Sequence, residues 1–321
     1  MRRSNLLCLV SLAFRRSQMS DFVRCLRSTL LACGLCGIPA LAQTAETDQR
    51  LPELGTETPP AEQSAVEGPS AAELEKIAKM TANPLGAAWM LWLQNDYSEI
   101  RGDLVPGGKR VNSTKFQPIM SFPIDIVDQD WNLIVRPVFQ YQSVPLGKSA
   151  GRLFGTSIDD IVADPGLGAI AASAFDDRTN GFGDTALMTL LGPDRLDGFI
   201  WGAGLTQIFP TAEEDVLGQG KWQAGPAFLA ARLAPNPGGW NYGALAQHWW
   251  SYAGDDDRDS TSQTDIQYFL NYRLSGTELV GMTPNIRYDW KADSDDRLTL
   301  PVGLGYSNVY KFGRLPIRIA A

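Results

Sequence analysis

Residues 264–309 read TDIQYFLNYRLSGTELVGMTPNIRYDWKADSDDRLTLPVGLGYSNV, and apolar and polar side chains alternate through most of this stretch. Successive side chains of a β-strand point to opposite faces, so the alternation separates an apolar face from a polar one. Three such runs lie at residues 264–274, 278–290 and 298–309. Each run reaches the roughly 9 to 11 residues that a tilted transmembrane strand needs. The stretch therefore predicts part of an antiparallel transmembrane β-barrel, oily outside and wet inside.

The composition is consistent with such a barrel. The chain has 321 residues, of which 44% are hydrophobic, enough for one large domain or two ordinary ones. Its mean hydropathy is negative, which argues against a bundle of transmembrane helices but not against strands with alternating faces. A soluble β-sandwich also alternates, but its apolar faces pack against each other and its strands average about five or six residues.

The first 42 residues are typical of a secretory signal peptide. They contain arginines, an apolar segment at residues 30–41 and a small-residue triplet at residues 40–42. Translation from Met19 would give this leader a more usual length. Two alternatives are disfavoured: a transmembrane anchor, because the apolar run is short, and lipidation at Cys33, because the cleavage triplet downstream is the better match.

All cysteines of the chain fall inside this leader, namely Cys8, Cys25, Cys33 and Cys36. The exported chain would therefore contain neither a thiol nor a disulfide, which excludes redox and thiolate-metal chemistry. The leader also carries six Arg and one Asp, so its removal changes the formal net charge from −8 to −13. Such an acidic chain is not expected to bind nucleic acid.

Three parts follow the leader. Residues 43–70 are rich in Ala, Pro, Glu and Thr and are predicted to form a disordered periplasmic tail. Residues 71–84 are predicted to form a short helix that stops at Asn83 and Pro84. This helix either docks near the mouth of the barrel or stays exposed to solvent. Residues 85–321 are predicted to form the barrel.

Eleven strands are predicted in the barrel region, at residues 87–97, 111–124, 131–142, 183–191, 199–209, 222–233, 240–253, 264–274, 278–290, 298–309 and 315–321. Alternate connections are short and rich in turn residues, whereas the connections between them are longer and, late in the chain, acidic. Short turns on one side and long loops on the other are typical of outer-membrane barrels. The longest connection, residues 143–182, is predicted to fold, either inward as a plug or over the surface as a lid.

Five groups of short motifs occur in a fixed order between Ile77 and Ile319. They are Ile77-Ala78-Lys79 with Asn83-Pro84, Gly181-Phe182-Gly183-Asp184, Leu217-Gly218 through Lys221-Trp222 with Ala224-Gly225-Pro226, Trp249-Trp250-Ser251-Tyr252-Ala253-Gly254, and Asp289-Trp290-Lys291-Ala292-Asp293-Ser294. In this order they resemble the bacterial outer-membrane family of phenol meta-pathway degradation proteins, whose members often bear the names neuromedin U or transporter. The resemblance implies a barrel of about twelve strands that passes small, including aromatic, compounds, and it brings no catalytic motif.

The chain departs from this family at its end. It stops at Ala321, where the family would complete one strand and add another, and it lacks a terminal aromatic residue. An odd number of strands is unusual for a bacterial barrel, and an open edge in lipid is costly. The sequence thus predicts that the barrel is truncated at its carboxyl terminus.

The polar faces of the strands supply the candidate site. The residues predicted to line the lumen are Arg136, Gln140, Asp265, Gln267, Asn271, Arg273, Asn285, Arg287 and Asp289. Their charges either select solutes or form structural ion pairs that close the interior. The acidic run at residues 255–259 lacks the spacing and glycine of a calcium loop and is predicted to be a solvated loop. No metal and no cofactor is predicted.

The only histidine, His248, is a candidate general base. A hydrolase would need a serine beside it, but Ser251 is expected on the opposite strand face. His248, with Trp249, Trp250 and Tyr252, is instead predicted to belong to an aromatic girdle at the membrane interface. No catalytic residue is predicted, so the chain is not expected to be an enzyme.

Two functions are expected from these features. The first is an outer-membrane channel or transporter of a Gram-negative bacterium for small, hydrophobic or aromatic solutes. Its partners would be membrane lipid, the solute and the outer-membrane assembly machinery. The alternative is a non-conducting outer-membrane barrel that serves as a structural or surface-adhesion protein through its acidic loops.

Overall fold

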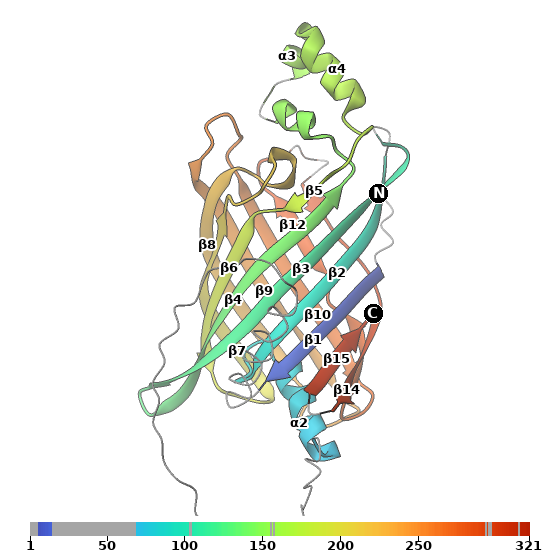
Figure 1. Cartoon of the computed structure of the whole chain (residues 1–321). Coiled ribbons are helices and arrows are strands. Elements are labelled where there is room, and N and C mark those ends of the chain that lie inside the picture. Colours follow the sequence, from blue (N-terminus) through green and yellow to red (C-terminus); the bar gives the residue numbers. More distant parts are fainter. Residues whose placement is uncertain are drawn as a thin grey trace, which may run out of the picture. The chain divides into compact units, whose positions relative to one another are not determined.

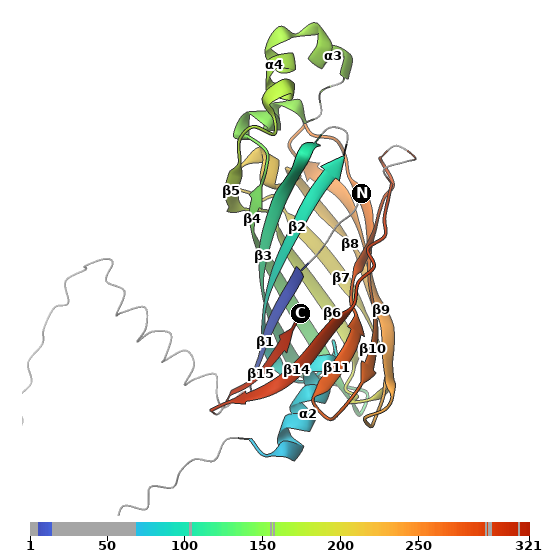
Figure 2. The same cartoon turned by 90° about the vertical axis from the view of Figure 1, so that its right-hand side faces the viewer.

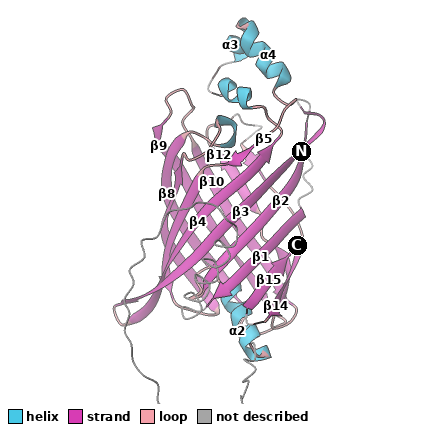
Figure 3. Cartoon of the chain, in the orientation of Figure 1, coloured by secondary structure: helices cyan, strands magenta, loops and turns pink. Residues whose placement is uncertain are grey.

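The computed structural model describes residues 6–14, 69–102, 105–154, 156, 158–292, 294, 297–313 and 315–321. Most of the predicted leader and nearly all of the predicted disordered tail lie outside these residues, so both stay predictions. The described part is mainly antiparallel β-sheet with a few short helices (Figures 1 and 3). None of its helices is long and apolar enough to cross a membrane.

The sheet is built largely from strands that follow one another as hairpins. Their bounds are β1 (Leu6–Phe14), β2 (Trp89–Gly102), β3 (Val105–Ile126), β4 (Gln129–Val144), β5 (Thr179–Phe182), β6 (Thr185–Pro193), β7 (Gly198–Phe209), β8 (Lys221–Leu233), β9 (Trp240–Gly254), β10 (Ser262–Arg273), β11 (Glu278–Met282), β12 (Asn285–Asp289), β13 (Leu298–Thr299), β14 (Gly305–Phe312) and β15 (Leu315–Ala320). The order in the sheet is β11-β14-β15-β1-β2-β3-β4-β6-β7-β8-β9-β10-β12-β13, with β5 paired to β4. Every described pair is antiparallel, which confirms the predicted all-β antiparallel class.

Two strands, β1 and β10, have neighbours that a simple succession of hairpins would not give them. β1, which falls within the predicted leader, pairs with β2 on one side and with β15 on the other. β10 pairs with β9 along one edge and with both β11 and β12 along the other. β11 in turn pairs with β14.

The predicted strands at residues 278–290 and 298–309 are each interrupted, the first at residues 283–284 and the second at residues 300–304. We call these two interruptions together the break. On both sides of the break the pairs with β10 keep one register, and so do the pairs between the two interrupted strands. A proline lies in each interruption, and proline cannot donate a ladder hydrogen bond. The prediction of two continuous strands was therefore wrong in the middle of this hairpin.

The two faces of the sheet differ in burial. One of them, the core face, carries a buried apolar cluster that includes Ile134, Leu190, Ile200, Leu229 and Leu245. The opposite, outer face carries large apolar side chains that are exposed, among them Phe199, Leu205, Phe228, Tyr242 and Trp250. The alternation read from the sequence therefore does separate two faces.

The connections also sort into two ends. At one end of the sheet, which we call the plug end after the segment around α2 (Ala71–Ala82), the turns are short, and α2 packs there against β14 and β15. These turns join β3 to β4, β6 to β7, β8 to β9, β10 to β11 and β14 to β15. At the cap end the chain forms η2 (Lys148–Leu153), α3 (Ile158–Ala163) and α4 (Pro165–Ser173) between β4 and β5, and η3 (Asp215–Leu217) between β7 and β8. The long connection thus folds, as predicted. Both views show α3 and α4 beyond the strand ends, which fits a lid and not an inward plug (Figures 1 and 2).

Candidate functional site

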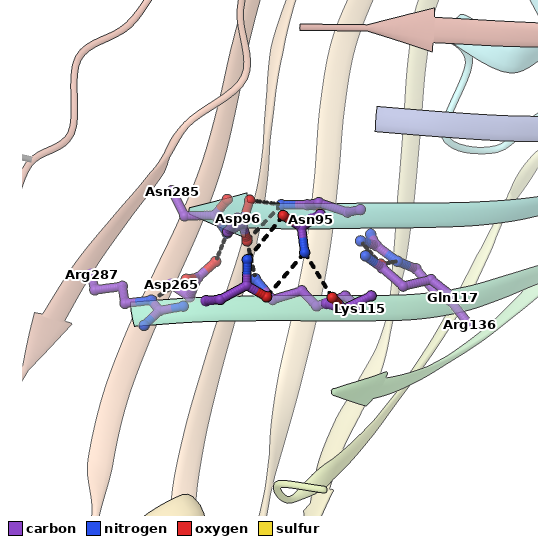
Figure 4. A network of polar contacts seen from close by, with 11 residues as sticks. Asn95, Asp96, Lys115, Gln117, Arg136, Asp265, Asn285 and Arg287 are labelled. Carbon is purple, nitrogen blue, oxygen red and sulfur yellow. Dashed lines mark hydrogen bonds and ion pairs between the residues drawn. The ribbon is translucent and has the colours of Figure 1, made fainter. Parts of the chain in front are cut away.

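Polar side chains cross the middle of the core face on β2, β3 and β4 (Figure 4). The Lys115 ammonium donates to Asp96 at 3.1 Å, and Arg136 Nε donates to Gln117 Oε1 at 2.9 Å. The Arg136 guanidinium also lies over the ring of Trp92, 5.5 Å from its centroid. Gln117 is only 1% exposed. Its buried amide oxygen accepts a hydrogen bond from the charged guanidinium of Arg136, so both polar groups have a partner inside the protein.

A second polar group lies on β10 and β12. The Asp265 carboxylate accepts hydrogen bonds from Asn285 Nδ2 at 2.6 Å and from Arg287 Nε at 3.3 Å. Asp265 is buried, whereas the Arg287 side chain is 66% exposed. The two groups together form the polar belt, whose members are Asp96, Lys115, Gln117, Arg136, Asp265, Asn285 and Arg287.

Both carboxylates of the polar belt are paired, Asp96 with Lys115 and Asp265 with Arg287, and Arg136 is a third cation that adds one positive charge. Arg136 contacts the amide oxygen of Gln117 and the ring of Trp92. Side chains that neutralise each other offer little net charge to a passing ion. Of the two alternatives for these residues, the geometry favours structural ion pairs over charge selection.

The nine residues predicted to line a lumen all alternate onto the core face. Arg136, Asp265, Asn285 and Arg287 belong to the polar belt, whereas Gln140, Gln267, Asn271, Arg273 and Asp289 lie outside it. Asp289 accepts from Gln263 Nε2 at 3.2 Å toward the cap end, and Arg273 is buried at the plug end. The structure therefore brings four of the nine together. That they line a passage stays a prediction.

Apolar side chains fill the core face at the plug end. Leu85, three residues beyond α2, is fully buried, and its methyl groups lie against Gly192 and Gly202. Asn83 fixes this turn, because its Nδ2 donates to Arg195 O at 2.6 Å and its Oδ1 accepts from Leu85 N at 2.9 Å. We call residues 71–86 the plug.

The helix of the plug is docked. It begins with a capping box in which Ser70 Oγ accepts from Glu73 N at 3.3 Å and Glu73 Oε2 accepts from Ser70 N at 2.9 Å. Arg318 Nη2 on β15 donates to Ala78 O at 3.0 Å. Ile77 and Met80 pack against the buried cluster. Of the two alternatives for this helix, docking is therefore the one that the structure has.

Aromatic side chains on the outer face form two belts. Toward the plug end the ring pairs are Trp89 with Phe122, Trp131 with Trp201 and Trp240 with Tyr272, and toward the cap end they are Tyr141 with Phe182, Phe209 with Trp222, His248 with Trp250 and Tyr288 with Trp290. On β9 the two belts are represented by Trp240 and Trp250, which are 52% and 51% exposed. They are ten positions apart along the strand, which is about 33 Å at a rise of about 3.3 Å per residue.

His248 lies in the belt at the cap end, and the hydroxyl of Ser262 lies 3.5 Å from its Nε2. Its Nδ1 lies 2.7 Å from Thr264 Oγ1, and its ring centroid lies 4.1 Å from that of Trp250. Ser251 alternates onto the core face, away from the imidazole, as the sequence predicted. Trp249 also lies on the core face, so its assignment to the girdle was wrong, because adjacent residues of a strand cannot share a face.

No protein-family model, curated protein or solved structure matches this chain. The resemblance to the phenol meta-pathway degradation family therefore stays a prediction, and the candidate site rests on geometry. Among the described residues, no group of three or more His, Cys, Asp or Glu side chains could hold a metal ion. In the acidic run, Asp255 Oδ1 accepts from Asp257 N at 3.0 Å within a turn.

Loops at the cap end are joined through two charged residues. Asp184, between β5 and β6, accepts from Gln219 N at 2.7 Å and from Ala212 N at 3.2 Å. Burial raises the pKa of the Asp184 carboxyl, although these N–H groups and the charge of Arg258 act in the opposite direction. The Arg258 guanidinium lies over the Phe154 ring at 4.5 Å. The lid and the neighbouring loops thus form one connected cap.

Sequence reasoning missed three members of the polar belt, namely Asp96, Lys115 and Gln117. A signal was present on β3, because Lys115, Gln117, Ile119 and Ser121 alternate with Phe116, Pro118, Met120 and Phe122. No local pattern announced the plug contacts, because they join residues more than a hundred positions apart in the sequence.

Proposed function

We propose that this chain is an outer-membrane β-barrel of a Gram-negative bacterium that takes up small, uncharged, hydrophobic or aromatic solutes. The sheet would form its wall. A continuous wall is supported by the pairings, since β10 contacts both β9 and β11, and β11 leads through β14 to β15. The strand between β15 and β2 is β1, which lies in the predicted leader, so the pairings support a closed wall only for the chain that keeps its leader.

The two aromatic belts on the outer face carry this proposal. At the strand tilt of about 40° that transmembrane barrels have, the two belts would be about 25 Å apart, which equals the apolar band that aromatic girdles flank at both interfaces. Large apolar side chains such as Leu205 and Phe228 are 67% and 58% exposed on the same face. A face of this kind in water would drive association, whereas acyl chains would cover it without cost.

The core face supports the choice of an uncharged solute. In the polar belt both carboxylates are paired with cations, and the remaining cation, Arg136, is bonded to the amide oxygen of Gln117, so the belt is not a ring of like charges such as lines a charge-selective pore. The plug covers the core face at one end with fully buried apolar side chains. The resemblance to the phenol meta-pathway degradation family points to aromatic solutes as well. Insertion of such a barrel would require the outer-membrane assembly machinery.

Uptake by whole cells tests the proposal. The full chain is expressed in a Gram-negative host, and the initial uptake of labelled toluene and phenol is compared with that of cells without the chain. The lipopolysaccharide leaflet slows apolar solutes, so a protein path adds measurably to the rate. We expect uptake to rise several-fold and the chain to fractionate with the outer membrane. Recovery of the chain in a soluble fraction would contradict the proposal.

A second candidate is a non-conducting barrel with a structural or adhesive role. The filled plug end favours it, because Leu85 is fully buried and Ile134 is 1% exposed. This candidate predicts outer-membrane fractionation with unchanged uptake of both solutes. The uptake experiment therefore separates the two functions.

A further inference from the structure

We propose that the break in the wall, residues 283–284 and 300–304, is a lateral opening through which small uncharged apolar solutes pass from the interior into the lipid. This inference rests on the proposed function, because it needs a barrel in a membrane. It adds the path by which the solute leaves.

Backbone hydrogen bonding is missing at the break although the strands on both sides are aligned. If the register of β11 with β14 is continued, Pro284 and Pro301 fall on neighbouring levels of the two strands. Neither proline can donate to a ladder. An unpaired backbone at membrane depth costs several kcal/mol per group, so it is found only where it lines a water-filled cavity or is buried in protein.

The break lies between the two aromatic belts. Val280 pairs with Tyr272 of the plug-end belt, and Trp290 belongs to the cap-end belt. Pro284 lies between Val280 and Trp290 on the same interrupted strand. The unpaired backbone would therefore be at the depth of the hydrocarbon and not at a membrane surface.

If the registers of β14 with β11 and of β11 with β10 are continued through the break, Gly303 falls on the core face, on the same level as Phe269. A Cβ placed on Gly303 would meet no atom within 4 Å. Asn285, the first residue of β12 after the interruption, is held by Asp265 of the polar belt. A solute that has reached the polar belt is therefore beside the break, whereas the plug covers the core face farther along.

The lipid side of the break defines the class of solute. Leu300, Val302 and Leu304 are 59%, 79% and 80% exposed, and neither interruption contains a charged residue. A charged solute would find no partner there, but an uncharged apolar one would exchange water for acyl chains.

One side chain bridges the break from outside. Tyr268 on β10 alternates onto the outer face, and its hydroxyl donates to Pro301 O at 3.1 Å across the intervening strand. This hydrogen bond joins β10 to residues 300–304, which make no backbone ladder bonds to the neighbouring strand. Removing it by Tyr268→Phe is expected to raise the initial rate of solute uptake.

A matched pair of variants tests the opening in the cell assay with labelled toluene. Gly303→Trp places an indole in the free space on the core side of the break, whereas Leu304→Trp places the same ring on the lipid side. We expect uptake by the Gly303 variant to fall to the level of cells without the chain. The Leu304 variant is expected to keep the wild-type rate.

A reversible cross-link serves as the second measurement, because it is made after folding. In a background with the four native cysteines replaced by Ser, a Cys pair at Thr283 and Gly303 spans the break, and a control pair at Leu279 and Ser307 spans the paired ladder beside it. A short thiol cross-linker with a reducible bond joins each pair. Uptake is expected to stop only when the pair across the break is joined, and to return on reduction.

The outcomes separate this inference from the proposed function. If wild type raises uptake, and the Gly303 variant and the variant cross-linked across the break raise it as much as wild type does, then the solute leaves by another path. That result would refute the opening but not the proposed function. If wild type itself gives no uptake above that of cells without the chain, the proposed function fails and the opening fails with it.

Discussion

A Cβ placed on Gly202 would lie only 3.1 Å from Leu85 Cδ2. A bare backbone position on β7 thus provides the space in which a leucine of the plug is buried. The two residues are more than a hundred positions apart, so their fit joins the plug to a distant strand of the sheet.

Leu85→Ala is expected to loosen the plug. Loss of a fully buried leucine side chain costs about 2–5 kcal/mol when the site cannot collapse. Cleavage by trypsin at Lys76 and Lys79 of α2 measures the exposure of the plug in the folded protein, and it should become faster. Gly202→Ala alone should also speed cleavage. The double variant should be no worse than Leu85→Ala alone, because the alanine fills space that the leucine left. Additive effects would contradict the contact.

An arginine on the outer face should be costly only in a bilayer. Leu205, 67% exposed on β7, is expected to lose about 2–4 kcal/mol of stability in lipid when it is replaced by Arg. The control, Asn236→Arg, changes the exposed turn between β8 and β9 and should change stability by less than about 0.5 kcal/mol. Urea unfolding in lipid vesicles, followed by tryptophan fluorescence, gives both values. Equal effects of the two variants would argue that water, not lipid, covers the outer face.

The pair of Asp265 and Arg287 should respond asymmetrically. Asp265→Asn removes a buried carboxylate that accepts two hydrogen bonds, and it should cost about 1–3 kcal/mol. Arg287→Gln removes the partner whose side chain is 66% exposed, and it should cost less than about 1 kcal/mol. The same urea titration measures both. If the ion pairs are structural, neither variant should make uptake selective for charged aromatic compounds.

Asp184 should make the stability of the cap depend on pH. Its pKa in the folded protein is raised by burial, so the folded chain keeps a proton that the unfolded chain has released. Stability is therefore highest below the ordinary carboxyl pKa and falls as pH rises toward the raised value. Asp184→Asn removes this contribution. The unfolding free energies of wild type and variant, measured across acidic pH, should diverge within that window. Parallel curves would contradict the shift.

The alternation of side chains made the fold class predictable. Most strands, and the core-face position of the nine candidate residues, follow from alternation with a period of two residues. The short and long connections follow from their lengths and turn residues. Both signals are local, so one sequence is enough to read them. The signal was also present for Lys115 and Gln117, whose strand reads with the same alternation.

Other features depend on contacts that no local pattern reports. The interruption of the hairpin at Pro284 and Pro301 could have been predicted, because proline cannot donate a ladder hydrogen bond. The strands were predicted as continuous because only the alternation was used. Trp249 was assigned to the girdle together with its aromatic neighbours, although consecutive residues of a strand point to opposite faces. The contact of Leu85 with Gly202 can be found only from the tertiary structure, because nothing in the sequence around a glycine indicates which distant side chain packs against it.

The constant register on both sides of the break has a mechanical consequence. Two strands that remain aligned above and below an unpaired segment can bow apart there and return without sliding, because no hydrogen bond has to be exchanged for another. Widening would be confined to a few residues, and the circumference of the structure would stay fixed while a molecule passes.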